Sequence, residues 1–438
     1  MPHSQHPIEL LRFNTCGSVD DGKSTLIGRL LYDSKSIMED QMEALERSAD
    51  ITGGGQINLA NLTDGLRAER EQGITIDVAY RYFATPRRKF IVADTPGHVQ
   101  YTRNMVTGAS TANLSIVLVD ARQGVIEQSR RHTYIASLLR IPHLVIAVNK
   151  MDLVDWSEDR FREIREEFES FLPLLDIKDV KFIPMSALNG DNVVEPSSRT
   201  PWYAGPTLLG HLESVHIASD WNLHGFRLPV QWVNRPNNPR DPKLHDFRGV
   251  SGQIAGGVVK AGQKIVILPS GHRSTVKEIW TYDGPLQEAF CPQSVTLVLE
   301  HDIDISRGDM LIGSENLPGM NADLRARVCW MGQRPLQCGK KYLLKHTTQT
   351  VQAVVTCLGN RISMDNFAAD PAATELAMND IGEIRFRAAK PLIFDGYANN
   401  RMTGAFILIE QGSHHTLAAG MLLPPTELVK AEYEDFTI

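Results

Sequence analysis

Cysteine is scarce in this chain of 438 residues, and its few positions show no pattern. The five cysteines are Cys16, Cys291, Cys329, Cys338 and Cys357. They form no Cys-x-x-Cys pair, and no cysteine or histidine has the spacing of metal ligands. An odd, scattered set in a large chain is typical of reduced thiols rather than of a disulfide framework. We therefore expect a cytosolic protein.

Long apolar runs are also missing from the sequence. No apolar stretch continues far enough to cross a bilayer. The opening segment, MPHSQHPIELLRFNTC, lacks the basic stretch followed by an apolar run that marks a secretory signal. These absences predict a cytoplasmic protein with no membrane association.

Positive charge is not in excess. Lysine and arginine number 45 against 52 aspartate and glutamate, which gives a net charge of −7. A mildly acidic surface argues against a broad, non-specific grip on nucleic acid, although a local basic patch survives such an average. We expect the short basic run Arg87-Arg88-Lys89 to be a solvated face rather than a nucleic-acid contact.

The sequence has the composition of a globular protein, with 42% hydrophobic and 22% charged residues. Its length predicts two or three domains. From Leu10 to about Leu212, short apolar runs alternate with longer amphipathic ones. The runs FIVAD (90–94), LSIVLVD (114–120) and LVIAVNK (144–150) are typical of buried parallel strands, each followed by a helix. This alternation predicts a doubly wound α/β domain with a mostly parallel sheet.

A different pattern follows a turn-rich segment at residues 196–206 (PSSRTPWYAGP) and one more helix. From Phe226 to Gly313, short alternating runs are punctuated by glycine, which predicts a small antiparallel β-barrel. A second β-rich segment runs from Ala322 to about Leu423. The predicted domains are an α/β domain at 1–222, a β-barrel at 223–320 and a second β-barrel at 321–438.

The most specific motif is a glycine-rich loop that matches G-x-x-x-x-G-K-[ST] and is followed by Thr25. Its residues are Gly17-Ser18-Val19-Asp20-Asp21-Gly22-Lys23-Ser24. An apolar run leads into it and the helical pattern TLIGRLL leaves it, which is the context of a phosphate loop. Glycines let backbone N–H groups approach phosphates, and the helix N-terminus adds partial positive charge. Lys23 would reach the β- and γ-phosphates, and the Ser24 hydroxyl would ligate Mg²⁺.

A second motif, Asp94-Thr95-Pro96-Gly97, ends the predicted strand FIVAD. An acidic residue at this strand end, beside the phosphate loop, is suited to hold Mg²⁺ through water. The Gly97 N–H is suited to contact a γ-phosphate, so its position would differ between triphosphate and diphosphate states. His98 follows directly, and we expect it to orient the attacking water and therefore to be catalytic.

The third motif selects the base. Asn149-Lys150-Met151-Asp152 closes the strand LVIAV, at the edge where open α/β sheets bind ligands. The Asp152 carboxylate accepts from both N1–H and N2–H₂ of guanine, which adenine does not offer. Asn149 would tie this loop to the phosphate loop. Ser186-Ala187-Leu188 fits the backbone contact to guanine O6.

A phosphate-sensing loop is predicted at REQGITI, between the first two motifs. Thr75 within it is our candidate for the second protein hydroxyl on Mg²⁺. It would be released on hydrolysis as the loop loses its order.

In order along the chain, GSVDDGKST, REQGITID, DTPGHVQYTRNMVTGAS, NKMD and SAL resemble the translation-factor GTPases, such as elongation factor Tu. GVVKAGQKI and ISRGDML in the β-rich segments resemble the paired barrels of that family. The resemblance covers nearly the whole chain. It implies a P-loop GTPase domain followed by two antiparallel β-barrels, with GTP and Mg²⁺ as ligands.

Several stretches differ from the translation factors, and these differences share a resemblance to one other family of GTPases. Their phosphate loop normally has histidine after the first glycine, where this chain has Ser18, with Asp20 and Asp21 shortly after it. GSVDDGKSTLIGRLLYD, DGLRAEREQGITIDVAYRYF and LVDARQGVIEQSRRH resemble the large, GTP-binding subunits of heterodimeric sulfate adenylyltransferase, also called ATP sulfurylase. By position, this resemblance assigns GTP contacts to Gly17–Thr25 (Val19 included), Asp94–His98, Asn149–Asp152 and Ser186-Ala187, and Mg²⁺ to Ser24 and Thr75.

In that family, GTP hydrolysis is coupled to formation of adenosine 5′-phosphosulfate and diphosphate from ATP and sulfate, in sulfate assimilation. No SGGxDS-type pyrophosphate loop occurs in this chain. We therefore expect the nucleotidyltransferase site on a smaller partner subunit, in a heterodimer or larger assembly, and no nucleic-acid partner. Some members carry a fused adenylylsulfate kinase after the second barrel, and we expect this sequence to stop before any such domain, whether naturally or by truncation.

Two other functions stay open. One is an elongation-factor-type GTPase that delivers aminoacyl-tRNA, and the other is a regulatory switch with no coupled enzyme. Net charge does not separate them, because acidic translation factors are common. Ser18 and the stretch after Thr75 favour the sulfate enzyme, and this preference comes from the resemblance.

Overall fold

The computed structural model describes residues 9–35, 59, 77–98, 101–177, 179–217, 222–236, 247–364 and 366–425. The chain divides into two compact units. One comprises Met1–Asp220 with Ser363–Ala368, and the other comprises Trp221–Ile362 with Ala369–Ile438. No helix in the described ranges is both long and apolar enough to span a bilayer.

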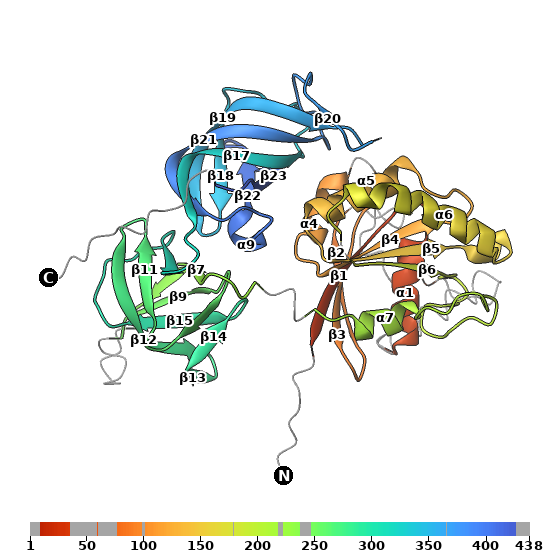
Figure 1. The fold of residues 1–438 in the computed structure, drawn as a ribbon, viewed down its shortest axis with the longest axis horizontal. Coiled ribbons are helices and arrows are strands. Elements are labelled where there is room, and N and C mark those ends of the chain that lie inside the picture. The colour runs from red at the N-terminus through yellow and green to blue at the C-terminus, as the bar shows by residue number, and fades with distance from the viewer. Residues whose placement is uncertain are drawn as a thin grey trace, which may run out of the picture. The chain divides into compact units, whose positions relative to one another are not determined.

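The first unit is built on a six-stranded sheet in the order β2-β3-β1-β4-β5-β6 (Figure 1). Its strands are β1 (Leu10–Cys16), β2 (Ala79–Ala84), β3 (Lys89–Asp94), β4 (Leu114–Asp120), β5 (His143–Asn149) and β6 (Asp179–Pro184). All neighbours pair in parallel except β2, which runs antiparallel to β3 at one edge. The predicted doubly wound, mostly parallel α/β domain is confirmed.

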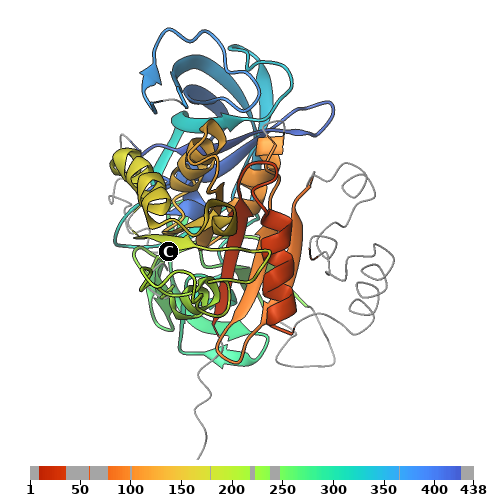
Figure 2. The same ribbon diagram turned by 90° about the vertical axis from the view of Figure 1, so that its right-hand side faces the viewer.

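Helices cover both faces of this sheet, with α4, α5 and α6 on one side and α1 and α7 on the other (Figures 1 and 2). The helices are α1 (Lys23–Asp33), α4 (Thr102–Ala109), α5 (Glu127–Leu138), α6 (Glu158–Phe171) and α7 (Leu208–Ser214), with short 3₁₀ turns η3 (Met151–Val154) and η4 (Leu172–Leu174). Because both faces are covered, every residue of the central strand β4 is buried. That is why its sequence, LSIVLVD, is almost continuously apolar.

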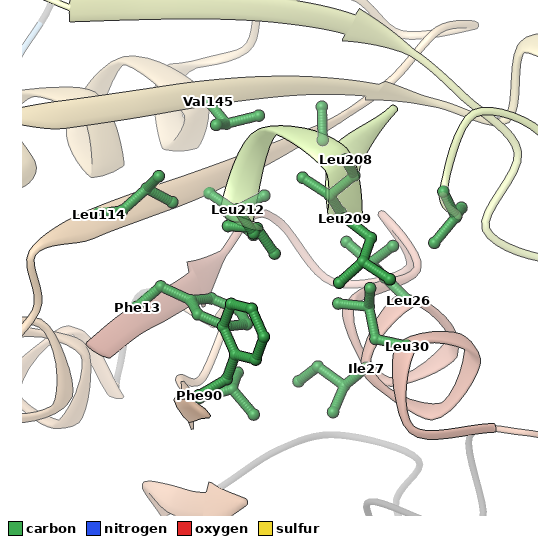
Figure 3. Packing of buried hydrophobic residues seen from close by; sticks show 14 of the residues in the cluster. Phe13, Leu26, Ile27, Leu30, Phe90, Leu114, Val145, Leu208, Leu209 and Leu212 are labelled. Atoms are coloured by element: carbon green, nitrogen blue, oxygen red, sulfur yellow. The ribbon is translucent and has the colours of Figure 1, made fainter. Parts of the chain in front are cut away.

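The core on the α1 side shows how the sequence pattern becomes packing (Figure 3). Leu26, Ile27 and Leu30 follow helical spacing on α1, and all three are fully buried. Leu208 and Leu212 of α7 join them over the apolar side chains of the sheet. This packing fixes the start of α1, and with it the loop between β1 and α1.

Arg88 corrects one prediction from the sequence. The run Arg87-Arg88-Lys89 does not lie wholly in solvent, because Arg88 is only 5% exposed. Its guanidinium donates to the carbonyls of Leu212 (3.0 Å) and Val215 (2.7 Å) at the end of α7. A cation at a helix C-terminus satisfies carbonyls that lack intrahelical partners and complements the helix dipole. Composition alone does not reveal such a buried role.

The second unit contains two sets of antiparallel strands. The first set forms an eight-stranded sheet and a small two-stranded one. Its strands are β7 (Arg227–Pro229), β8 (Trp232–Asn234), β9 (Gly249–Gln253), β10 (Val258–Lys260), β11 (Lys264–Leu268), β12 (His272–Thr281), β13 (Gly284–Leu286), β14 (Glu288–Phe290), β15 (Ser294–Leu299) and β16 (Met310–Gly313). The Arg227 N–H donates to the Gly256 carbonyl and the Ala255 N–H donates to the Arg227 carbonyl, which joins β7 to the residues just after β9 and closes the sheet.

The other set forms a sheet in the order β18-β22-β23-β17-β21-β19-β20, with β18 also paired to β19. That additional pairing closes a barrel. Its elements are β17 (Gly319–Trp330), β18 (Lys341–His346), β19 (Gln349–Ile362), β20 (Ala369–Asp370), β21 (Ile381–Phe394), β22 (Ala405–Ile409) and β23 (Thr416–Leu422), with a short helix α9 (Arg401–Gly404). Two antiparallel β-barrels after the α/β domain are thus confirmed, and the domain boundaries at 222/223 and 320/321 stay a prediction.

A buried ion pair joins the two barrels. The Arg227 guanidinium donates to both carboxylate oxygens of Asp395 at 3.0 and 2.9 Å, and the Thr403 hydroxyl donates to the same carboxylate at 2.7 Å. Arg227 is 3% exposed. Removing one partner of such a pair leaves the other charge buried without compensation.

Arg227→Met is therefore expected to lower the free energy of unfolding of the β-rich unit by about 3 kcal/mol. Urea unfolding followed by circular dichroism measures the change. Arg387→Met is the matched control, because the Arg387–Asp323 pair is largely exposed and should leave the midpoint unchanged. Equal midpoints for both variants would show that the Arg227–Asp395 pair does not stabilise this unit.

Candidate nucleotide site

The loop from Gly17 to Gly22 leaves β1 and enters α1, and it curls around the side chain of Lys23. The Lys23 ammonium donates to the carbonyl oxygens of Gly17 (3.1 Å) and Ser18 (2.7 Å). The Ser18 N–H donates to the Asp21 carboxylate at 2.5 Å. Gly22 has φ 91°, a left-handed conformation that favours glycine, and this turn aims the start of α1 at the loop. The sequence motif has thus folded into a phosphate-loop shape.

Val19 and Asp20 form the turn at the tip of this loop. Val19 is half-buried, whereas Asp20 is exposed and has φ 68°, a left-handed conformation that aspartate tolerates better than most residues. The role of Val19 in GTP binding stays a prediction. Any such contact would come from its backbone N–H, because an apolar side chain offers phosphate no hydrogen bond.

Charge in this loop is buried and balanced. Burial lowers the pKa of Lys23, and the nearby carboxylates of Asp94 and Asp21 oppose that shift. Burial also raises the pKa of Asp21 to about 6, against the opposing effect of the Lys23 charge. An ammonium held in a loop of backbone groups is suited to receive an anion.

Asp94 lies at the end of β3, in register with Thr15 on β1. The Thr15 hydroxyl donates to the Asp94 carboxylate at 3.4 Å, and the Thr95 hydroxyl donates to the Thr15 carbonyl at 2.6 Å. Asp94 is 2% exposed. Ser24 sits in the first turn of α1, so a hydroxyl and a carboxylate flank the phosphate loop. These are the oxygen ligands that Mg²⁺ prefers, directly or through water, and the predicted third ligand, Thr75, lies outside the described residues.

Gly97 is packed directly on the phosphate loop. A Cβ at this position would lie 2.3 Å from the Gly17 carbonyl oxygen and 2.5 Å from the Lys23 ammonium, so only glycine fits. The Gln128 side chain of α5 donates to the Gly97 carbonyl at 3.2 Å. His98 follows as an exposed residue, with its ring in edge contact with Tyr101. The loop after β3 is therefore placed where it contacts the phosphate loop.

Asn149 connects three loops. Its amide donates to the Asp21 carbonyl at 2.7 Å and accepts from the Ala187 N–H at 2.9 Å. A Cβ on Gly22 would lie 2.5 Å from the Asn149 amide nitrogen. The predicted connection between the NKMD loop and the phosphate loop is present, and the structure adds the third loop, at Ser186-Ala187.

Asp152 lies in the short turn η3 and has one carboxylate oxygen buried without any hydrogen-bond partner. Buried carboxylate oxygens are rarely left unpaired, so this one is available to accept a hydrogen bond from a ligand or from water. Lys150 precedes it in a left-handed conformation, φ 62°, at the mouth of the same loop. Ser186 and Ala187 are each 1% exposed, and Leu188 is exposed beside them. These loops present the groups that a guanine base needs.

Two further residues belong to this site, and neither was predicted from the sequence. Arg29 of α1 donates to the carbonyls of Ala187 (3.3 Å) and Leu188, which fixes the loop after β6. Asp120 ends β4, between the strands that carry the phosphate loop and the NKMD loop. A signal for Asp120 was present, because it closes an apolar run as Asp94 and Asn149 do.

Comparison with known proteins identifies the family to which this chain belongs. The elongation factor Tu GTP binding domain matches residues 9–223, and the GTP-eEF1A C-terminal domain-like family matches residues 323–423. A sulfate adenylyltransferase subunit 1 of Bacteroides fragilis is 53% identical over 96% of this chain and 87% of its own length. The chain belongs to the sulfate adenylyltransferase subunit 1 family.

Other relatives agree with this assignment. The sulfate adenylyltransferase subunit 1 of Teredinibacter turnerae is 52% identical over 98% of this chain and 91% of its own length. Bifunctional CysN/CysC enzymes of Mycobacterium tuberculosis and Rhodopirellula baltica are each 54% identical, and the chain spans 67% and 64% of their lengths. Membership of the sulfate adenylyltransferase subunit 1 family confirms the resemblance found in the sequence and favours it over the translation-factor alternative.

Proposed function

We propose that this chain hydrolyses GTP and couples that reaction to formation of adenosine 5′-phosphosulfate and diphosphate from ATP and sulfate on a smaller partner subunit. The observation that carries the guanine assignment is the unpaired, buried carboxylate oxygen of Asp152, held in a loop that Asn149 joins to the phosphate loop. All five cysteines are free, which supports a reducing, cytoplasmic location.

The proposed triphosphate contacts divide between two loops. Lys23 exchanges its bonds to the Gly17 and Ser18 carbonyls for bonds to the β- and γ-phosphate oxygens, which are stronger because both partners are charged. Backbone N–H groups from Gly17 to Thr25 bind the remaining phosphate oxygens. Ser24 and Thr75 would hold Mg²⁺ directly and Asp94 through water, and the ion would neutralise charge that develops on the phosphates.

The proposed base contacts come from the other edge of the site. The Asp152 carboxylate accepts from guanine N1–H and N2–H₂, and the stem of Lys150 covers the face of the ring. The Ala187 N–H donates to guanine O6, supported by Ser186 and Leu188 in the same loop. In the structure this N–H donates to the Asn149 side-chain oxygen, and it would exchange that acceptor for guanine O6 when the base binds. The Met151 side chain is fully buried, which holds the NKMD loop against the core of the domain.

For hydrolysis we propose that His98 orients a water molecule in line with the γ-phosphate. A bond forms between the water oxygen and the γ-phosphorus, the bond to the β,γ-bridging oxygen breaks, and the products are GDP and inorganic phosphate. Gly97 lies against the phosphate loop, so loss of the γ-phosphate changes the surroundings of the segment that carries His98. The changed segment is the signal that a partner subunit would detect.

Coupling requires that the two reactions depend on each other. The phosphate–sulfate anhydride is a high-energy product, so its formation from ATP and sulfate is unfavourable by itself. Coupling to GTP hydrolysis would supply the free energy for net formation. The family name, subunit 1, supports a second kind of subunit in the relatives. Binding linkage is reciprocal, so ATP and the partner should also change the affinity of this chain for GTP.

The test is diphosphate release from ATP and sulfate by the reconstituted pair, measured with and without GTP, alongside phosphate release from GTP. GTP is expected to raise adenosine 5′-phosphosulfate formation at least tenfold, by a coupling free energy of about 1.4 kcal/mol or more. A non-hydrolysable GTP analogue should not sustain net synthesis. A translation factor would be favoured instead by two results together. The rate of adenosine 5′-phosphosulfate formation would not change with GTP, and the rate of GTP hydrolysis would change with aminoacyl-tRNA but not with the partner subunit.

A further inference from the structure

Asp120 is a deeply buried acidic residue near the proposed base site, with a side chain only 1% exposed. It closes β4, in register with Asn149 at the end of β5. Its carboxylate accepts from the Arg122 guanidinium at 3.0 and 2.6 Å and pairs with the Lys150 ammonium at 3.0 Å. One buried carboxylate thus holds a cation of the NKMD loop and a second cation beside it.

The electrostatics of this cluster keep Asp120 ionised. Burial alone would raise its pKa, but the hydrogen bonds from Arg122 and Lys150 outweigh burial and lower the pKa of Asp120 to about 2. The carboxylate therefore carries a full charge at any physiological pH. It can hold both cations whether or not a nucleotide is bound.

The same two cations are the natural competitors for Asp152. Lys150 precedes it by two residues in the same loop, and Arg122 is close enough for the Asp152 charge to favour its protonated form. Yet one oxygen of Asp152 is buried without a partner. An ammonium bound to that oxygen would occupy the acceptor that the base requires.

We propose that Asp120 is a specificity-determining positioning residue: by holding Lys150 and Arg122 it keeps the Asp152 carboxylate open for guanine and fixes the Lys150 stem over the base. This role rests on the proposed assignment of Asp152 to guanine. Asp120 has no part in the proposed nucleotide contacts and acts through its two cations. It therefore tunes base recognition and leaves phosphate contacts alone.

A purely structural Asp120 would behave differently. If it only stabilised the turn after β4, its loss would weaken GDP and IDP binding by the same factor. If it protects Asp152, its loss should reduce the preference for GDP over IDP, because hypoxanthine lacks the 2-amino group that Asp152 reads. The ratio of the two affinities separates the roles.

The experiment uses the full chain and measures GDP and IDP affinities by calorimetry for the wild type, Asp120→Asn, and Asp120→Asn combined with Lys150→Met or with Arg122→Met. Asp120→Asn is expected to lower the GDP-to-IDP affinity ratio about tenfold, the worth of one charge-assisted hydrogen bond. Removing the released cation should restore the ratio in at least one double variant. Arg122→Met alone is the control and should keep the ratio, because Asp120 still holds Lys150.

Two outcomes would overturn the proposal. An unchanged ratio in Asp120→Asn, with both affinities reduced equally and no restoration in either double variant, would leave Asp120 a structural residue. A wild-type ratio near one would overturn the guanine assignment of Asp152 itself, and this role with it. If Asp120→Asn does not fold, Asp120→Glu displaces the carboxylate by one methylene and is expected to lower the ratio in the same direction.

Discussion

Substitution of Asp152 by asparagine is expected to weaken GTP binding about a hundredfold and to raise the affinity for XTP. In the proposed wild-type contact, both carboxylate oxygens accept hydrogen bonds from donors on the guanine edge. Asparagine turns one of these acceptors into a donor, so an N–H group faces an N–H group in a buried site. Unpaired polar groups in such a site are costly, and sites built on paired ones discriminate strongly. Xanthine has a carbonyl oxygen in place of the 2-amino group, which matches the new donor.

Calorimetric titration of GTP, XTP and ATP measures this change. Asp155→Asn is the matched control, because Asp155 is an exposed residue at the end of the same turn and adopts a left-handed conformation that asparagine tolerates. The control should bind all three nucleotides as the wild type does. Tight ATP binding by the wild-type chain would refute the guanine assignment directly.

The sequence was sufficient to predict which loops lie together wherever a polar residue follows an apolar strand. Parallel strands end at the same edge of the sheet. The residues at or just after three strand ends are therefore expected to lie close together there, namely Gly17, Asp94 and Asn149. The same logic predicted both barrels from alternating runs and glycine turns. In each case the prediction depends on local sequence, because neighbouring residues determine the hydrophobic period and the type of turn.

Contacts between distant segments were not predictable in this way. Arg29 contacts the loop at Ala187, and Arg88 contacts the end of α7, across separations of more than 100 residues. Each arginine looks like an ordinary surface cation in its local context. Their roles depend on which carbonyl oxygens the fold leaves unpaired, and only the packed structure decides that. Asp120 is intermediate, since its strand-end position was visible but its two cationic partners were not.

Gly97 shows a different limit. The sequence predicts its contact with a γ-phosphate, but the contact that excludes any side chain is with the Gly17 carbonyl and the Lys23 ammonium. Loop-to-loop packing therefore requires glycine here before any contact with a nucleotide is considered. A motif read alone does not separate these two causes.

Lys23→Ala and His98→Ala are expected to separate binding from chemistry. Lys23→Ala removes the ammonium from the interior of the phosphate loop and should weaken GTP binding by a factor of about 100 to 1,000, since charge-assisted bonds to two phosphate oxygens are lost. Lys35→Ala is the matched control, because Lys35 is an exposed lysine just beyond the same helix. It should bind GTP normally.

His98→Ala should leave GTP affinity within about twofold of the wild type and slow hydrolysis by a factor of about 100, the usual worth of one positioned catalytic group. His98 is exposed at the end of the described segment after β3, so its removal leaves the core intact. Calorimetry gives the affinities, and single-turnover phosphate release in the presence of the partner subunit gives the rates. Wild-type hydrolysis by His98→Ala would assign His98 a structural role, and a matching loss of affinity would mean that it binds the nucleotide rather than orienting water.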